Sequence, residues 1–458
     1  MPLLQPDHAL EVCRHLVQAS SADETEVSLE CVEENYVRFD ERGPTQSADR
    51  ERYHLVVRAR VQGPGGTQEG QAACGSLDCD DGRAALERAL TLARLAGPRA
   101  GLLPMPGPAA VRETAAQRPT RDHTLREKVG WITAAQSACR RDGLLPAGLA
   151  RTGAIGRTLV NSAGREVTGA VSDASFALTA FRAGEAGGSA MAEVSNPNVE
   201  RLEIDEVIES AVERAVRSRG PVDHRPRETT VVLMPHAVSA LLHFAGHHGF
   251  GAQEFAERSS FLCERVGKSL FPDSVRIYDD AGHEIAPGMP FDGQGWPRER
   301  FALLEGGSLQ GPVTDANWAA RLGVPNSGHG FAAGQGGRAH GGPSPENLVV
   351  AAGNETLEQL IAGVEDGLLV NQLHYTNMIE PRDLTLTGMT RGGTFRIQGG
   401  RVTQAVRNLR FTETLVNVLQ RVSGVGSVQQ AASNLAGGRV VCPAMRVERF
   451  RFTSTTDF

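Results

Sequence analysis

The chain has 458 residues, of which 40% are hydrophobic and 22% charged, a composition that excludes fibrous and wholly disordered classes. Its formal net charge is −7 at pH 7. Because duplex nucleic acid and anionic membranes are held by clustered cations, we expect neither as a partner.

The seven cysteines are an odd number without a CxxC pair, which indicates a reducing compartment rather than a disulfide scaffold. The first residues lack the cationic and apolar regions of a signal peptide. No apolar run reaches the ~18–20 residues that span a bilayer. The sequence therefore predicts a soluble cytoplasmic protein.

In the first half, helices alternate with strand patterns. Apolar side chains at helical spacing predict helices at 7–20, 82–97, 125–143 and 203–219. Alternation of apolar and polar side chains predicts an antiparallel pair at 25–42 and 52–61, with further strands at 155–181. We interpret residues 1–222 as an N-terminal domain in which helices accompany an antiparallel sheet.

A boundary is expected near 220–228, where Gly, Pro and charge occur without periodicity. After it, a buried strand at 229–235 leads directly into an apolar helix at 236–248. Short strands with tight turns follow, together with a helix at 355–368 and a long Gly-rich loop at 325–346. Residues 223–458 are therefore predicted to form a β-rich C-terminal domain, and the fold class is α+β.

Four of the 13 histidines cluster on the apolar helix. His243 and His247 lie one turn apart, and His236 lies two turns before His243, so the three share a stripe. Two imidazoles at that spacing can hold one zinc ion. However, Phe244 follows His243 at the position where a zinc protease of the HExxH type carries its general base.

A fixed carboxylate would therefore have to come from elsewhere, and Glu254 and Glu257 are the nearest candidates. The alternative interpretation is that these histidines only pack or form hydrogen bonds at the end of a helix.

Several segments, in this order, resemble the TldD/PmbA (TldE) proteins, historically called modulators of DNA gyrase. They are VVLMPHAVSALLHFAG (231–246), ERSSFLCERVGKSLFPD (257–273), PFDGQGWPRERFALLEGGSLQG (290–311), NSGHG (326–330), ETLEQLIAGVEDGLLV (355–370), GGTFRIQGGRVTQAV (392–406) and PAMRVERF (443–450). The resemblance implies an α+β N-terminal domain, a β-rich C-terminal domain and dimerisation around an enclosed cleft.

The resemblance also implies one of two subunit types. The TldD type resembles a zinc peptidase with HExxxH and a C-terminal cysteine ligand, whereas the PmbA/TldE type lacks that set and pairs with the first. When LLHFAGHHG is aligned with the zinc-type pattern LLHExxxHG, His243 and His248 fall on the two histidines of the pattern, and Phe244 falls on its Glu. Cys442 lies closer to the chain end than the zinc-type pattern would put it. The chain is therefore more similar to the PmbA/TldE type.

The leading hypothesis is a non-catalytic subunit of a heterodimer whose TldD-like partner supplies zinc, while this chain holds none or binds it weakly. It would complete a cleft for unfolded or modified peptides. A second hypothesis is a homodimeric hydrolase with its own metal on His243 and His247 or His248, with Cys442 as a further ligand. A third is a metal-free module that binds peptides or small molecules.

Further candidates for a substrate cleft are His236, His329, His340, His374 and Tyr375. For the two loop histidines, His329 and His340, the alternative is an ordinary solvent-facing position. For the His374–Tyr375 pair it is packing at a strand edge.

Overall fold

The computed structural model describes residues 5–184, 188–331, 341–433 and 439–456. The first half contains α1 (Pro6–Ala19), β1 (Glu24–Asp40), β2 (Gly43–Gly63), β3 (Gly66–Cys74), α2 (Cys79–Leu95), α3 (Arg118–Asp122), α4 (Leu125–Arg141), β4 (Leu145–Asn161), β5 (Glu166–Phe181), β6 (Ser189–Asn196), the 3₁₀ turn η1 (Val199–Arg201) and α5 (Ile204–Arg217).

The second half contains β7 (Glu228–Leu233), α6 (Pro235–His248), α7 (Ala252–Ala256), β8 (Ile277–Asp279), β9 (Phe301–Glu305), β10 (Ser308–Leu309), α8 (Ala316–Leu322), β11 (Gly330–Phe331), β12 (Gly342–Pro343), β13 (Leu348–Val350) and α9 (Leu357–Ala362). It ends with β14 (Asp366–Glu380), β15 (Thr385–Gln398), β16 (Arg401–Ala405), β17 (Leu409–Thr414), α10 (Leu415–Gln420), β18 (Val422–Ser433) and β19 (Arg439–Thr455).

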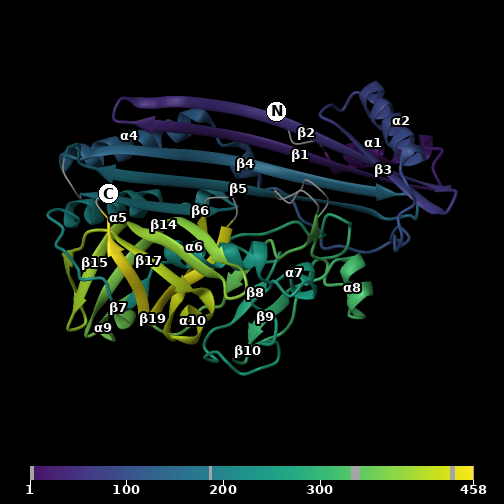
Figure 1. The fold of residues 1–458 in the computed structure, drawn as a ribbon. Coiled ribbons are helices and arrows are strands. Elements are labelled where there is room, and N and C mark those ends of the chain that lie inside the picture. Colours follow the sequence, from purple (N-terminus) through teal and green to yellow (C-terminus); the bar gives the residue numbers. More distant parts are fainter. Residues whose placement is uncertain (1–4, 185–187, 332–340, 434–438, 457–458) are drawn as a thin grey trace.

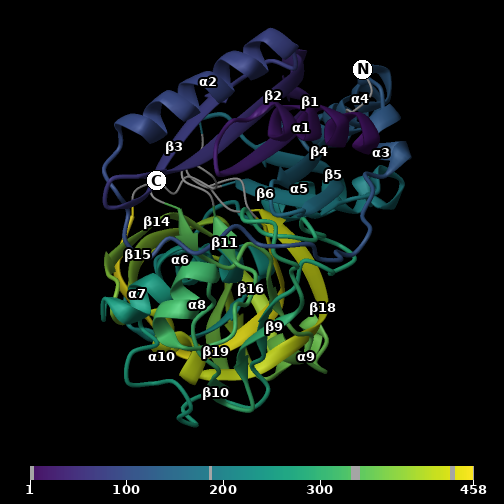
Figure 2. The same cartoon turned by 90° about the vertical axis from the view of Figure 1, so that its right-hand side faces the viewer.

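The first half is an antiparallel sheet in the order β3-β2-β1-β4-β5-β6. Along β1 the odd-numbered side chains form one apolar face: Val27 and Leu29 pack with α1 and α2, whereas Val37 and Phe39 pack with α4 and α5. Successive side chains of a strand point to opposite faces, so the four helices cover the same side of this sheet. Figure 2 shows α2 lying along the outer surface over β2 and β3.

The opposite face of this sheet is polar and lies toward the second half of the chain (Figure 1). Glu30 and Glu34 of β1 form ion pairs with arginines of β4. One of those arginines, Arg157, also lies 3.9 Å from Glu346 of the second half. The alternation of apolar and charged residues in β1 therefore has a structural reason. One face of the sheet carries the helices, and the other forms a charged interface with the second half of the chain, which we call the seam.

In the second half, strands close into a ring. β19 pairs with β17, which pairs with β15, then β14 and β7, and β7 pairs back to β19. α6 follows β7 and packs against β14, β19 and β18. The fold is therefore α+β as predicted, with a β-rich second half. The predicted boundary after residue 222 stays a prediction.

Two predicted elements differ from the structure. The helix predicted at 355–368 ends at Ala362, because Gly367–Val370 pair with both β7 and β15 inside the ring. The strand predicted at 52–61 begins already at Gly43, since β2 stays paired with β1 along an exposed polar stretch. In both places pairing with neighbouring strands decided the local structure: with the adjacent β1 across a hairpin for β2, and with the distant β7 and β15 for Gly367–Val370.

Among the residues that the structure describes, no helix is long and apolar enough to cross a membrane.

Candidate functional site

Helix α6 begins with a proline and buries one apolar side. Pro235 is at the first turn, where its missing N–H costs no hydrogen bond. Leu241 and Leu242 lie in the core of the second half, and that leaves the histidines on the other side of the helix.

The structure brings two of the predicted metal residues together at the C-terminal end of α6. The ring centroids of His243 and His247 are 4.5 Å apart, and those of His247 and His248 are 6.3 Å apart. Partial burial, followed by the two neighbouring imidazoles, lowers the pKa of His243 to about 4. His243 is therefore neutral at pH 7, which is the form that binds metals.

Cys442 lies at the opposite end of the helix. Its side chain is fully buried, and Sγ donates a hydrogen bond to the carbonyl oxygen of Pro235 at 3.2 Å. Pro235 precedes His243 by about two helical turns, or ~12 Å. Burial also raises the pKa of the Cys442 thiol, so the thiolate that zinc prefers is disfavoured.

A complete metal site is not assembled by the residues that the structure describes: no three His, Cys, Asp or Glu side chains gather there as a metal-binding group. The position after His243 is occupied by Phe244, which packs against the core of the second half. Within the described residues, the His243–His247 pair therefore does not form part of a three-ligand zinc centre.

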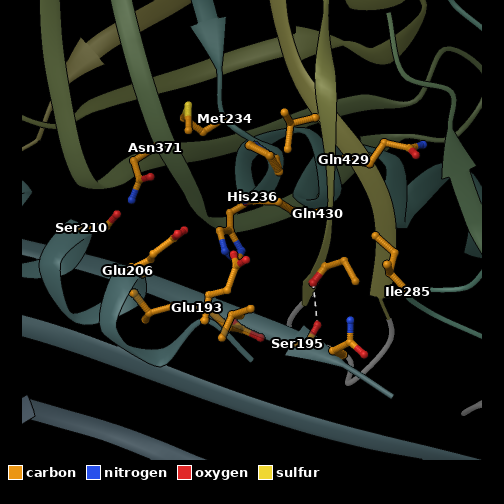
Figure 3. Close-up of a pocket in the computed structure, with 18 of the residues that line it drawn as sticks. Glu193, Ser195, Glu206, Ser210, Met234, His236, Ile285, Asn371, Gln429 and Gln430 are labelled. Carbon is orange, nitrogen blue, oxygen red and sulfur yellow. Dashed lines mark hydrogen bonds between the residues drawn. The ribbon is translucent and has the colours of Figure 1, made fainter. Parts of the chain in front are cut away.

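His236 instead lies in a cavity of about 300 Å³ at the seam between the two halves. β6 and α5 form one wall, and the β7–α6 junction, β14 and β18 form the other. In Figure 3 the His236 ring and the Glu193 carboxylate point toward one another. Burial, then the nearby Arg214, lowers the pKa of His236 to about 4, so the ring is neutral at pH 7.

The cavity combines charged and amide side chains that hydrogen bonds from both halves hold in place. Arg214 donates a hydrogen bond to Oδ1 of Asn371 at 3.0 Å, and Ser433 donates one to Glu193 at 2.6 Å. Burial raises the pKa of Glu193, and the bond from Ser433 opposes that shift. The pocket therefore offers donors and acceptors to a polar ligand.

The same cavity is bordered by the edge of the first sheet. β6 pairs with β5 on one side only, and on its other side Ser195 donates a side-chain hydrogen bond to the carbonyl oxygen of Ala431 in β18 at 2.8 Å (Figure 3). Glu193 and Ser195 therefore lie on a strand edge that faces the cavity.

The remaining candidate residues lie elsewhere. The solvent-facing interpretation of His329 is wrong, because its side chain is buried beside Asp279. His340 lies outside the described residues. His374 contacts Arg391 at 2.6 Å, and Tyr375 is 65% exposed with a φ of 48°. Neither residue is among those that line the seam cavity.

Sequence reasoning missed Glu193 and Arg214, two ionisable residues that line this cavity together with His236. No local pattern marks them, because β6, α5 and α6 are separated in the sequence and meet only in the folded chain.

Fold and site together define a two-part α+β protein with a polar cavity at the seam and a histidine helix beside it. Residues 118–219 match the PmbA/TldA metallopeptidase central domain, and residues 226–454 match the C-terminal domain of the same family. The chain belongs to the TldD/PmbA family of metallopeptidase-like proteins.

Curated relatives match only in part. A metalloprotease of Methanothermobacter thermautotrophicus is 22% identical over 233 residues, which cover 50% of this chain and 49% of that protein. Metalloprotease PmbA of Escherichia coli O157:H7 is 25% identical over 195 residues, 42% of this chain and 39% of that protein. The chain thus spans about half or less of the length of these relatives.

The fold extends over nearly the whole chain. The crystal structure of TldE from Thermococcus kodakarensis superimposes with a TM-score of 0.86 at 18% sequence identity, covering 96% of this chain and 100% of that one. This likeness shows that the two chains share a fold.

Proposed function

We propose that this chain is the non-catalytic, TldE-like subunit of a two-component metallopeptidase. The proposal rests on two features of the histidine helix. Phe244 stands where a zinc protease carries its general base, and Cys442 is hydrogen-bonded to Pro235 at the end of α6 away from the imidazoles. A TldD-like partner would supply both zinc and the base.

In this proposal the seam cavity takes up part of an unfolded or modified peptide. The edge of β6 offers main-chain groups, which bind an extended peptide with little dependence on its sequence. The neutral ring of His236 and the side chain of Glu193 supply hydrogen-bonding groups to the peptide. All seven cysteines are free, which suits a reducing cytoplasm as the place of assembly.

The test is co-expression with a chain that carries LLHExxxHG. We expect the two proteins to co-purify, with near-stoichiometric zinc in the complex and at most traces in this chain alone. A chain that stays separate from that partner, and binds neither metal nor peptide, would contradict the proposal. Peptide binding without a partner or metal would favour the metal-free module.

The close approach of His243 and His247 favours one further candidate, a metal-dependent homodimer. Both imidazoles can offer a nitrogen to a weakly bound divalent ion, provided that a carboxylate comes from another chain. Stoichiometric zinc in the isolated protein, lost in His243→Ala, would favour this candidate over the heterodimer.

A further inference from the structure

A second group of reactive side chains lies away from the histidine helix, at the wall of a cavity of about 1000 Å³. Ser327 lines this cavity, and its Oγ lies 2.9 Å from Nδ1 of His329. Nε2 of His329 lies 3.2 Å from Oδ1 of Asp279. Ser327 is half-buried, whereas His329 and Asp279 are buried, so hydroxyl, imidazole and carboxylate follow one another from the cavity inward.

A tight turn brings the serine and the histidine together. Gly328 stands between them with a φ of +70°, and a Cβ there would lie 2.2 Å from the carbonyl oxygen of Pro297. Its N–H donates a hydrogen bond to Oδ1 of Asn326 at 3.0 Å. Only glycine fits this position, and the turn fixes the side chains on either side of it.

The surroundings of Asp279 set the role of the imidazole. Burial opposes the charge of Asp279, but Arg298 at 2.6 Å, His329 and the N–H of Asn347 at 2.7 Å hold its pKa well below the usual range. A permanent carboxylate favours the tautomer with hydrogen on Nε2. Nδ1 is then the acceptor for the hydroxyl hydrogen of Ser327.

Two further contacts bear on how strongly the imidazole of His329 activates Ser327. The N–H of His329 is not aligned with Asp279 despite the short distance, a geometry that commonly tightens when substrate binds. The hydroxyl of Ser327 also lies 3.1 Å from the carbonyl oxygen of Thr314, while the N–H of Thr314 donates to Oγ at 2.7 Å. The imidazole is the nearer of the two acceptors.

The cavity in front of Ser327 is mainly apolar. Trp296, Phe301 and Phe255 line it together with several prolines. Beside the serine, the side-chain nitrogen of Asn326 is buried without a hydrogen-bond partner among the described residues. A donor next to a nucleophile is suited to an oxygen that becomes negatively charged during acyl transfer.

We propose that Ser327, with His329 as general base, forms a metal-independent nucleophilic site for esters of apolar acids. Oγ bonds to the acyl carbon while the ester C–O bond breaks. The hydroxyl proton passes to Nδ1 and then to the leaving alcohol. Water then attacks the acyl-serine through the same base and releases the acid, so one ester and one water give one acid and one alcohol.

The test uses the full-length chain, a fluorophosphonate probe and p-nitrophenyl butyrate. Mass spectrometry is expected to map the phosphonyl adduct to Ser327, and EDTA is expected to leave ester hydrolysis unchanged. Ser327→Ala should lower the labelling rate by at least about 100-fold, the scale of base-assisted attack. Ser308→Ala, on β10, is the matched control and should label like wild type.

Circular dichroism and the thermal midpoint establish whether each variant is folded. If Ser327→Ala does not fold, the site of the phosphonyl adduct in the wild-type protein still tests whether Ser327 is the nucleophile. A folded wild-type protein without an adduct on Ser327, or a folded Ser327→Ala variant with undiminished hydrolysis, would overturn the proposal.

Discussion

At the scale of single residues, the proposed non-catalytic role depends most on Phe244, the residue that follows His243 on α6. Its ring is partly buried against the core of the second half, so it also contributes to packing. A carboxylate there would lose that packing, and Cys442 would still be hydrogen-bonded to the carbonyl oxygen of Pro235, at the opposite end of the helix from His243.

Phe244→Glu is therefore expected to destabilise the protein by about 1–3 kcal/mol without creating peptidase activity. Urea unfolding and a peptide-cleavage assay with added zinc measure both effects. Phe244→Leu keeps the site apolar and should cost less than about 1.5 kcal/mol. Chelator-sensitive cleavage by the Glu variant would show that the metal site is more complete than we infer.

His236 makes the stability of the seam depend on pH. Its pKa is about 4 in the folded chain, below the ordinary value of about 6.5, so the unfolded chain binds more protons between these pH values. Stability from the neutral ring is present above pH ~6.5 and is lost as the pH falls toward 4.

When the pH falls from 7.5 to 5.0, the free energy of unfolding of the wild type should decrease by about 1–2 kcal/mol more than that of His236→Gln, because glutamine cannot gain a proton. Urea midpoints at the two pH values give this difference. Equal losses in both proteins would mean that His236 titrates normally.

At the scale of elements, α6 keeps its two ends chemically separate. The imidazole pair lies near the C-terminal end, and Cys442 contacts the N-terminal end at Pro235. Substitution of the cysteine should therefore not affect any metal held by the histidines.

Any zinc measured in the isolated chain is expected to be unchanged by Cys442→Ser and lost in His243→Ala. Metal analysis of both variants after dialysis checks this expectation. If Cys442→Ser alone removes the metal, the cysteine reaches the imidazoles, and the separation that we describe is wrong.

Elements with strong local periodicity could be predicted from the sequence. The helix predicted at 236–248 agrees with α6 because its apolar spacing is a local signal, although α6 begins one residue earlier, at Pro235. The predicted helix at 355–368 was too long because its last residues are apolar and pair as a central strand. The solvent-facing interpretation of His329 is wrong because a Gly-rich loop looks exposed in sequence, whereas Asp279 and Phe301, from distant parts of the chain, lie against the imidazole.

At the scale of the whole molecule, a charged seam joins the two halves. Asp173 of β5 forms ion pairs with Arg439 of β19 and, at 3.0 Å, with Arg151 of β4. All three side chains are partly buried. Without the aspartate, two cations would face each other across the seam.

Asp173→Ala is expected to lower the free energy of unfolding by about 2–4 kcal/mol, because it removes the ion-pair partner of the partly buried Arg439, while Arg151 keeps its pair with Glu34. Glu213→Ala removes a solvent-exposed pair with Arg217 and should change stability by less than about 0.5 kcal/mol. The thermal or urea unfolding midpoints of the two variants measure this difference in stability. A difference within error would mean that the seam does not depend on this network.

The seam also explains why the cavity could not be predicted. Its walls come from β6, α5, α6, β14 and β18, and no local pattern specifies how the two halves meet. Of the residues named here as lining the cavity, the sequence predicts only His236 as a cleft residue.

The most direct test of a non-catalytic role is peptide cleavage by this chain alone and together with an HExxxH-bearing partner. We predict no zinc-dependent cleavage by the isolated chain, cleavage by the pair, and loss of that cleavage when the partner's Glu is changed to Gln. His243→Ala in this chain should leave the activity of the pair unchanged. Cleavage by the isolated chain that chelators abolish and zinc restores would contradict the account.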